Sequence, residues 1–464
     1  MEPVERLGGQ GGGETRSVKK VAAASFIGTT IEWYDFFLYG TAAALVFGEL
    51  FFPESEPLVG TLLALGTYAV GFVARPVGGI VFGHFGDRIG RKSMLVLSLI
   101  IMGVATVLIG LMPTYASIGV LAPVLLVVLR FAQGIGVGGE WGGAVLMSVE
   151  HAPKGRRGFF GSWPQMGVPA GLLLANAVFW LVQALTSEAA FMAWGWRVPF
   201  LASAALVAVG LFIRLKLMES PAFERVKETQ TEARRPIVDV VRKYPREVLV
   251  AMGMRVAENG CFYILTVFVL AYGAEELGLS EGTMITGVII AAAIGLVTVP
   301  LWGALSDRIG RRPLYLAGAV VTTLWAFPLF GLLNTETPIL IWLSIVVGVN
   351  LGHDMMYGPQ AAYFSELFGT RVRYSGASLG YQLASVFAGG LAPLVATALL
   401  AANGGSPTFV ALYMMAMGLI SVVATLYATE TFQKDMHEDE QAERELVRER
   451  RFDRERLREP AERR

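Results

Sequence analysis

Two short stretches of nearly the same sequence decide the fold. They read Gly83-His84-Phe85-Gly86-Asp87-Arg88-Ile89-Gly90-Arg91-Lys92 and Gly303-Ala304-Leu305-Ser306-Asp307-Arg308-Ile309-Gly310-Arg311-Arg312. The second begins 220 residues after the first (303 − 83), and both contain Asp-Arg-Ile-Gly-Arg. A second echo matches Glu150 and Arg157 to Glu366 and Arg373, at an offset of 216 residues (366 − 150). Two echoes at similar offsets indicate that the chain consists of two related halves.

Long apolar segments lie on either side of both stretches. Hydrophobic residues make up 54% of the chain and charged residues 16%, against about 25% charged residues in a typical soluble domain. A membrane-spanning helix needs about 20 mostly apolar residues. We predict twelve such helices, at 21–47, 59–82, 93–112, 118–149, 158–185, 197–218, 247–272, 284–305, 313–333, 338–366, 375–402 and 408–429.

The charges of the connecting loops test this count. The loops expected on one side are rich in Lys and Arg, whereas those expected on the other side contain Glu and neither Lys nor Arg. Lys and Arg stay on the cytoplasmic side during insertion, which predicts a plasma-membrane protein with both termini in the cytoplasm. The expected parts are a cytoplasmic segment 1–20, a six-helix half 21–218, a cytoplasmic loop 219–246, a six-helix half 247–430 and a solvated, charged tail 431–464. The predicted fold is therefore all-α, with twelve transmembrane helices in two pseudo-symmetric halves.

The repeated loops have a physical logic as turns between two helices. Gly90 can adopt a backbone conformation that other residues resist, and Asp87 can sit at a helix N-terminus, where the helix dipole favours an anion. Arg88, Arg91 and Lys92 are expected to anchor the loop in water. The candidate gating residues are Gly83, Asp87, Arg88, Gly90 and Arg91 in the first loop and Asp307, Arg308, Gly310 and Arg311 in the second.

These loops resemble the signature loop of the major facilitator superfamily, G-x-x-x-D-[RK]-x-G-[RK]-[RK]. Further segments resemble its metabolite:H+ symporter branch, which includes carriers of dicarboxylates, shikimate, and proline or betaine. Those segments are Thr30–Gly40, Ala74–Gly79, Arg130–Gly134, Gly139–Gly143, Glu219–Phe223 and Tyr357–Ala362. The resemblance covers residues 20–430 and implies alternating access, with Asp87 and Arg91 helping to latch the cytoplasmic side. Related halves of this kind enclose a site near the bilayer midplane.

Charged side chains inside the predicted spans are the candidate functional groups, because each costs at least about 2.5–3.5 kcal/mol to insert. They are Glu32, Asp35, Arg75, Arg130, Glu140, Arg255, Glu258, His353 and Asp354. Five carboxylates face three arginines, which leaves two carboxylates without a permanent cation. A buried carboxylate of that kind tends to hold a proton, as a proton-coupled carrier requires.

We assign roles to these residues on that basis. Glu32, Asp35 and Glu258 are candidate proton carriers. The candidate substrate-binding residues are Arg130 and Arg255, whose fork-shaped side chains suit a carboxylate, together with Asn259, Tyr357, Gln360 and Tyr381. Arg75, Glu140, His353 and Asp354 are further intramembrane charges without an assigned role. In the alternative interpretation, these groups form static ion pairs between helices, and Arg130 and Arg255 neutralise carboxylates.

Other classes of protein find little support. The single cysteine and four histidines lack metal-ligand spacing. The glycine run Gly134–Gly139 loosely resembles a dinucleotide-binding turn. It lies inside a predicted span, however, where small residues favour close helix packing. We expect no enzyme activity, no metal, no nucleic-acid partner and no cofactor apart from the coupling proton. The expected function is proton-coupled import of a small organic solute, an organic acid first and a zwitterion second, by a monomer in the lipid bilayer. A drug:H+ or metabolite:H+ exporter of the same fold and a non-transporting sensor are the alternatives.

Overall fold

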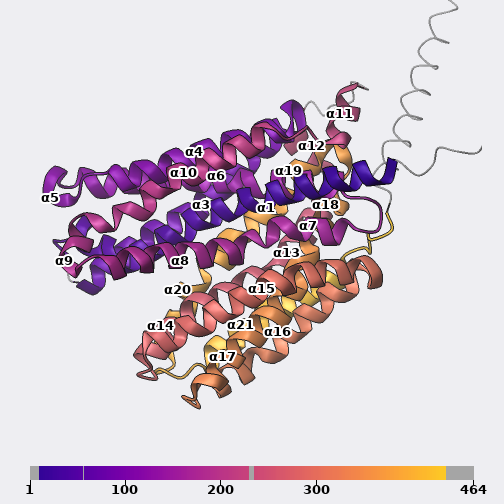
Figure 1. Ribbon diagram of the computed structural model, residues 1–464. Coiled ribbons are helices and arrows are strands. Elements are labelled where there is room, and N and C mark those ends of the chain that lie inside the picture. Colours follow the sequence, from indigo (N-terminus) through magenta and orange to yellow (C-terminus); the bar gives the residue numbers. More distant parts are fainter. Residues whose placement is uncertain (1–9, 56, 229–234, 435–464) are drawn as a thin grey trace, which may run out of the picture.

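The computed structural model describes residues 10–55, 57–228 and 235–434 of the 464-residue chain. Every regular element within those ranges is a helix (Figure 1). The predicted solvated tail lies outside the described residues from position 435 onward. Twelve long helical segments follow one another, in agreement with the prediction, and several of them continue through short π-helical turns.

The N-terminal half contains six of these segments. They are α1 (Gln10–Ala42) continued by η1 (Ala43–Phe47) and α2 (Gly48–Phe51), α3 (Pro57–Ile89), α4 (Arg91–Leu111), α6 (Leu121–His151), α7 (Arg157–Gln165) continued by α8 (Gly167–Leu185), and α10 (Arg197–Leu215). The short elements α5 (Tyr115–Ile118), α9 (Glu188–Ala190) and η2 (Phe191–Gly195) lie between them, and α11 (Pro221–Glu228) and α12 (Pro236–Lys243) lead to the second half.

The C-terminal half repeats the pattern. Its segments are α13 (Pro245–Tyr263) continued by η3 (Ile264–Phe268) and α14 (Val269–Glu275), α15 (Glu281–Ile309), α16 (Arg311–Leu333), α17 (Pro338–Val346) continued by η4 (Val347–His353) and α18 (Asp354–Leu367), η5 (Thr370–Val372) followed by α19 (Arg373–Ala384), η6 (Ser385–Gly390) and α20 (Ala392–Ala402), and α21 (Thr408–Tyr427).

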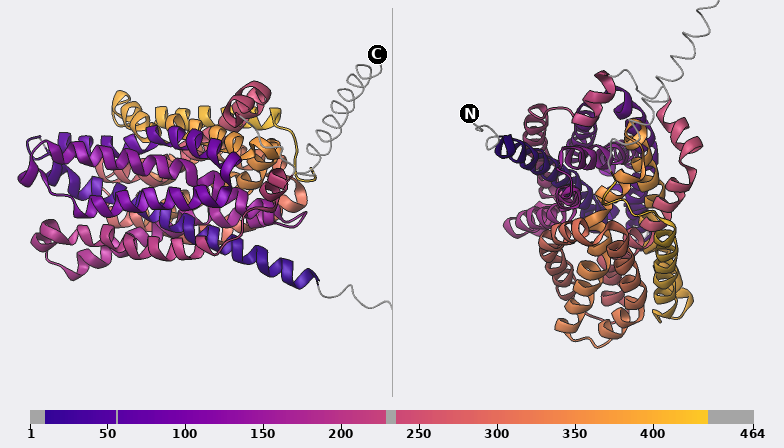
Figure 2. Two further views of the ribbon diagram at one scale, coloured as in Figure 1. Left: turned by 90° about the horizontal axis from the view of Figure 1, so that it is seen from above. Right: turned by 90° about the vertical axis from the view of Figure 1, so that its right-hand side faces the viewer.

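Eleven helices of the described chain are long and apolar enough to cross a membrane. The first segment is the exception, because Glu32, Asp35 and the threonines around them lower its hydropathy. Its α1 portion begins at Gln10, eleven residues before the predicted start at 21, and has 33 residues. At 1.5 Å per residue such a helix is about 50 Å long, so it exceeds a bilayer core of about 30 Å. Figure 2 shows α1 projecting beyond the neighbouring helices at one end of the bundle.

Glycines allow α3 and α6 to lie against each other. A Cβ atom added at Gly134 would collide with the carbonyl oxygen of Gly71, and one added at Gly138 would collide with that of Arg75. The small residues of Gly134–Gly139 therefore serve helix packing, as expected, and no strand precedes them in the described chain.

The two signature loops make equivalent contacts in the two halves. Gly90 precedes α4 with φ of 128° and Gly310 precedes α16 with φ of 103°, in the region that favours glycine. Asp87 accepts hydrogen bonds from the backbone N–H groups of Tyr374 (3.3 Å) and Ser375 (2.9 Å), in the first turn of α19. Asp307 likewise accepts from Gly158 (2.8 Å) and Phe159 (2.9 Å), in the first turn of α7. Each aspartate thus caps a helix of the other half.

The residues of the second repeated motif, Glu150 and Arg157 with Glu366 and Arg373, likewise pair across the two halves. Glu150 lies 3.1 Å from Arg373, and Glu366 lies 3.8 Å from Arg157. Arg91 adds a contact of 3.3 Å to Glu150, and Arg311 adds one of 3.2 Å to Glu366. The expectation that Arg91 lies in water is therefore wrong. The residue is 1% exposed, because the carboxylates of Glu150 and Asp87 take the place of water around it, whereas Arg88 is exposed.

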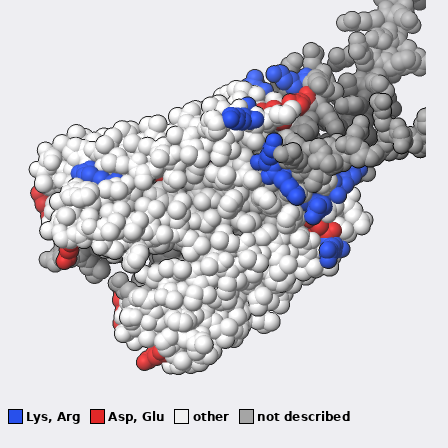
Figure 3. All heavy atoms as spheres, viewed as in Figure 1, with Lys and Arg blue, Asp and Glu red and all other residues white. Residues whose placement is uncertain are grey.

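Charge is segregated along the bundle. Lys and Arg gather at the end that carries the signature loops, with some Asp and Glu beside them, whereas Asp and Glu predominate at the opposite end (Figure 3); we call these the basic end and the acidic end. Arg197, which starts α10 near the acidic end, donates hydrogen bonds to the carbonyl groups of Gly110 and Met112. Figure 3 also shows the surface hollowed between the two halves at the acidic end. The halves are thus joined at the basic end.

Candidate functional site

All nine intramembrane charges predicted from the sequence are buried, with exposed fractions of 5% or less. The structure separates them into two groups. Arg255, Glu258, His353 and Asp354 come together in the C-terminal half through α13, η4 and α18. Glu32, Asp35, Arg75, Arg130 and Glu140 belong to α1, α3 and α6 of the N-terminal half.

Arg255 is held inside its own half. Its Nη1 atom lies 2.6 Å from Glu258 and also donates to Gln360 at 3.1 Å. The guanidinium carbon lies 3.1 Å from the ring centre of Tyr381. Three predicted site residues, Glu258, Gln360 and Tyr381, therefore meet around Arg255, and Glu258 neutralises its charge in an ion pair.

The ring of Tyr381 also joins the two halves. It stacks on Trp141 of α6, with ring centres 3.6 Å apart and an interplanar angle of 16°. Trp141 donates through Nε1 to Gln165, which in turn donates to the backbone carbonyl of Tyr357 at 3.1 Å. The Arg255 ion pair is therefore connected directly to the seam between the halves.

Glu140 has a partner that the sequence analysis missed. Both oxygens of Glu140 accept from the guanidinium of Arg214 on α10, and Ser98 donates to it at 2.9 Å. Arg214 is 2% exposed, although it stands near the end of the predicted span 197–218, where an arginine ordinarily reaches water. Gly28 of α1 provides room for it, because a Cβ atom there would collide with the guanidinium. The count of three buried arginines is thus incomplete.

Arg75 and Arg130 have no carboxylate partner in the described part of the chain. In both side chains the Nε and Nη2 atoms are buried and make no hydrogen bond. Phe36 lies between the two guanidinium groups, 4.4 Å from that of Arg75 and 4.6 Å from that of Arg130. Phe72 covers Arg75 at 4.5 Å, and Tyr39 covers Arg130 at 4.2 Å. Aromatic rings therefore cover the faces of both cations, and the donors along one edge of each are left open.

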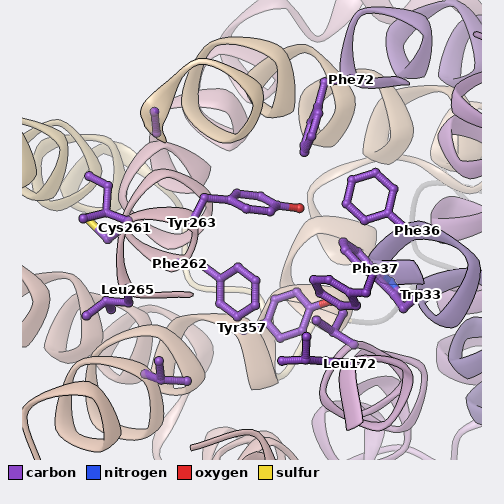
Figure 4. Close-up of a cluster of buried hydrophobic side chains, with 14 of the residues drawn as sticks. Trp33, Phe36, Phe37, Phe72, Leu172, Cys261, Phe262, Tyr263, Leu265 and Tyr357 are labelled. Atoms are coloured by element: carbon purple, nitrogen blue, oxygen red, sulfur yellow. The ribbon is translucent and has the colours of Figure 1, made fainter. Parts of the chain in front are cut away.

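The aromatic rings around this pair come from both halves. Figure 4 shows Trp33, Phe36, Phe37 and Phe72 facing Phe262, Tyr263 and Tyr357. Phe72 and Tyr263 are in edge-to-face contact with ring centres 5.3 Å apart. Tyr263 Oη and Asn259 Oδ1 are buried without a hydrogen-bond partner in the described residues. A solute between the halves would find two guanidinium edges and unsatisfied polar groups within an aromatic wall.

Glu32 and Asp35 of α1 make their contacts within the N-terminal half. Asp35 accepts a hydrogen bond from Ser203 of α10. Glu32 is within electrostatic range of Arg75, Arg214 and Glu140, but it forms no ion pair with a described residue, and its Oε2 atom has no hydrogen-bond partner. The prediction of two carboxylates without a permanent cation is compatible with this pair, although two arginines are unpaired as well.

Comparison with known proteins identifies the family. Residues 25–393 match the family model of the Major Facilitator Superfamily. The chain is 42% identical over 410 residues to the shikimate transporter of Escherichia coli, covering 88% of this chain and 94% of that protein. It is 36% identical over 429 residues to the glycine betaine/proline/ectoine/pipecolic acid transporter OusA of Dickeya dadantii, covering 90% and 85%. The chain therefore belongs to the Major Facilitator Superfamily and is a multi-pass membrane transporter of metabolites, not an enzyme.

The fold agrees with solved structures of the superfamily. The proton:xylose symporter XylE bound to 6-bromo-6-deoxy-D-glucose superposes with a TM-score of 0.75 at 19% sequence identity, covering 92% of this chain and 99% of the symporter chain. At that identity the likeness concerns the fold, namely twelve helices in two halves.

The Glu140–Arg214 pair gives a prediction about stability. Arg214→Gln leaves a buried carboxylate without its partner, and we expect the free energy of unfolding to fall by about 3–5 kcal/mol. The double variant Glu140→Leu, Arg214→Met removes both charges and should recover most of that loss. Thermal unfolding of the purified protein in detergent measures both effects. A single variant as stable as the unmodified chain would contradict a structural role for the pair.

Proposed function

We propose that this transporter imports an organic carboxylate together with protons. The observation that carries the proposal is the pair of open guanidinium edges on Arg75 and Arg130. Nε and Nη2 lie on the same edge of a guanidinium, and a carboxylate can accept both N–H groups at once. A buried cation without a partner is costly, so an anionic solute that fills this edge supplies the missing counter-charge. The shikimate transporter of Escherichia coli, a relative at 42% identity, is named for a solute of this class.

The orientation of the protein in the membrane follows from charge in the same proposal. The basic end faces the cytoplasm by the positive-inside rule, and both termini lie on that side. The hollow between the halves then opens to the outside, where an importer takes up its solute (Figure 3).

A zwitterion is the second candidate. Trp33, Phe36 and Phe72 form an aromatic wall beside the guanidinium pair. Aromatic rings bind quaternary ammonium groups through cation–π interactions, while Arg75 or Arg130 would hold the carboxylate. The substrates for which OusA is named, which include glycine betaine and proline, belong to this class.

A measurement of external pH tests the function. Cells expressing the protein are suspended in weak buffer, and shikimate, glycine betaine, proline and xylose are added one at a time. We expect shikimate to make the medium more alkaline, because symport removes protons from it. Alkalinisation with glycine betaine alone would select the zwitterion, and acidification would indicate export. No change with any of the four, despite protein in the membrane, would contradict import with protons.

The shape of Arg75 gives a second prediction. Arg75→Lys keeps the positive charge but loses the two-donor edge. Hydrogen bonds to charged groups contribute about 1.5–3 kcal/mol, so we expect KM for the carboxylate to rise roughly 10- to 100-fold. Initial rates of labelled shikimate uptake measure KM and kcat separately. Arg246→Lys, a change at an exposed residue of the basic end, is the control, and an unchanged KM for Arg75→Lys would rule out direct contact.

Glu32 and Asp35 give a third prediction. If they carry protons, Glu32→Gln and Asp35→Asn abolish accumulation of the solute against a gradient, because the substituted amide side chains do not bind and release a proton. Exchange of internal for external solute should persist, since it needs no net proton movement. Uptake and counterflow in proteoliposomes measure the two activities. Normal accumulation in both variants would show that neither residue carries the proton.

A further inference from the structure

His353 is placed between two carboxylates. Its Nε2 atom lies 3.2 Å from Glu258 Oε1, and its Nδ1 atom lies 2.9 Å from Asp354 Oδ1. Both carboxylates are also held on their far sides. Glu258 Oε2 accepts from Arg255 and Gln360 at 2.6 and 3.1 Å, and Asp354 Oδ2 accepts from Thr298 and Asn350 at 2.5 and 2.9 Å. The histidine noted in the sequence as one more intramembrane charge is therefore the middle of a chain of three ionisable groups.

The contact geometry implies a proton count for this trio. Each of the two contacts joins a ring nitrogen to a carboxylate oxygen, so each needs one hydrogen atom. A neutral imidazole has only one N–H group. The trio therefore contains either an imidazolium between two carboxylates or a neutral ring with one carboxylic acid. In both cases it holds one proton more than a neutral ring between two carboxylates, and this proton belongs to the trio as a unit.

The surroundings set the charge balance. With its extra proton the trio has a net charge of −1, which the Arg255 guanidinium on Glu258 balances. Arg255 is the only permanently charged side chain of the described chain in contact with the trio. The other titratable groups that face it are neutral thiol or phenol groups, namely Cys261, Tyr263, Tyr315, Tyr357 and Tyr381. Loss of the proton thus leaves an uncompensated negative charge in the bundle.

A small cavity connects the trio to the seam between the halves. It has a volume of about 20 Å³ and touches His353 and Asp354 on one side and Val168, Pro169 and Leu172 of α8 on the other. That volume suffices for about one water molecule. The side chains of Glu258, His353 and Asp354 are only 2–6% exposed, so the proton is enclosed in this conformation. Because α8 belongs to the N-terminal half, a movement of one half against the other changes this wall.

We propose that Glu258, His353 and Asp354 form a proton-binding site of the C-terminal half, which loads and releases a coupled proton through the water-sized cavity against α8. This inference rests on the proposed symport function. Tyr263 lies within electrostatic range of Arg75, Arg130, Arg255 and Glu258, so the trio and the guanidinium pair lie close enough to influence each other. Loss of the proton adds a negative charge that Arg255 does not balance, and this charge disfavours an anion at Arg75 and Arg130. The protonated trio, which Arg255 balances, permits the anion to bind. By linkage, each ligand then favours binding of the other.

Transport by purified, full-length protein in proteoliposomes tests the trio, with labelled shikimate as the probe. The variants are His353→Gln, which cannot be protonated, His353→Lys, which keeps a positive charge, and Asp354→Asn, which tests the trio without changing the histidine. The control is His151→Gln at the basic end, where the ring contacts the carbonyl of Met147. Accumulation driven by an inward proton gradient is compared with counterflow at equal pH.

We expect the ratio of accumulation to counterflow to fall roughly 5- to 150-fold in the three trio variants, the usual range for coupling between two sites. His151→Gln should keep the unmodified ratio. The counterflow of the unmodified chain should depend on pH more steeply than that of His353→Gln. Accumulation by His353→Gln and Asp354→Asn at the unmodified level would overturn the role of the trio and leave the proposed function intact. Counterflow without any proton-driven accumulation by the unmodified chain would overturn both.

Discussion

At the basic end, carboxylates of each half bind groups of the other half, and the rest of the structure depends on this constraint. Asp87 and Asp307 each cap the first turn of a helix in the opposite half, and Glu150 and Glu366 each face an arginine of the opposite half. Anions at helix N-termini and paired charges are stable when buried, but water can replace their partners when the seam opens. Such a seam can close firmly without a permanent apolar interface, as a carrier with two accessible states needs.

The two halves on either side of this seam differ in how their buried charges are balanced. The C-terminal half neutralises its own charges, since Arg255 and His353 lie on Glu258 and Asp354. The N-terminal half leaves Arg75 and Arg130 open, even though Glu32 lies within electrostatic range of Arg75. A proton site in one half and an anion site in the other, with the Trp141–Tyr381 stack between them, would bring both ligands to the surface along which the halves move.

Much of the fold could be predicted from the sequence, because membrane helices and loop charges follow from local composition. The repeat also predicted the two halves and the conformational role of Gly90 and Gly310. Pairing could not be predicted, because it depends on which helices are neighbours. Arg214 is absent from the predicted intramembrane charges because it stands near the end of its span, yet α1 and α6 enclose it. Arg91 was expected in water, but Glu150 contacts it. Arg255 was a candidate for substrate binding, but Glu258, one helical turn away, pairs with it.

The open guanidinium edges bear on how a symporter avoids leaking protons. Two buried cations whose Nε and Nη2 donors have no acceptor among the described residues make an empty, closed carrier unfavourable. An anion that fills those edges removes this cost and therefore favours the enclosed state that must form before the seam can open on the other side. When a proton binds at the trio without the anion, the free-energy cost of the unpaired guanidinium donors remains. In the proposed mechanism, the unpaired arginines of the N-terminal half thus make passage of the proton conditional on passage of the solute.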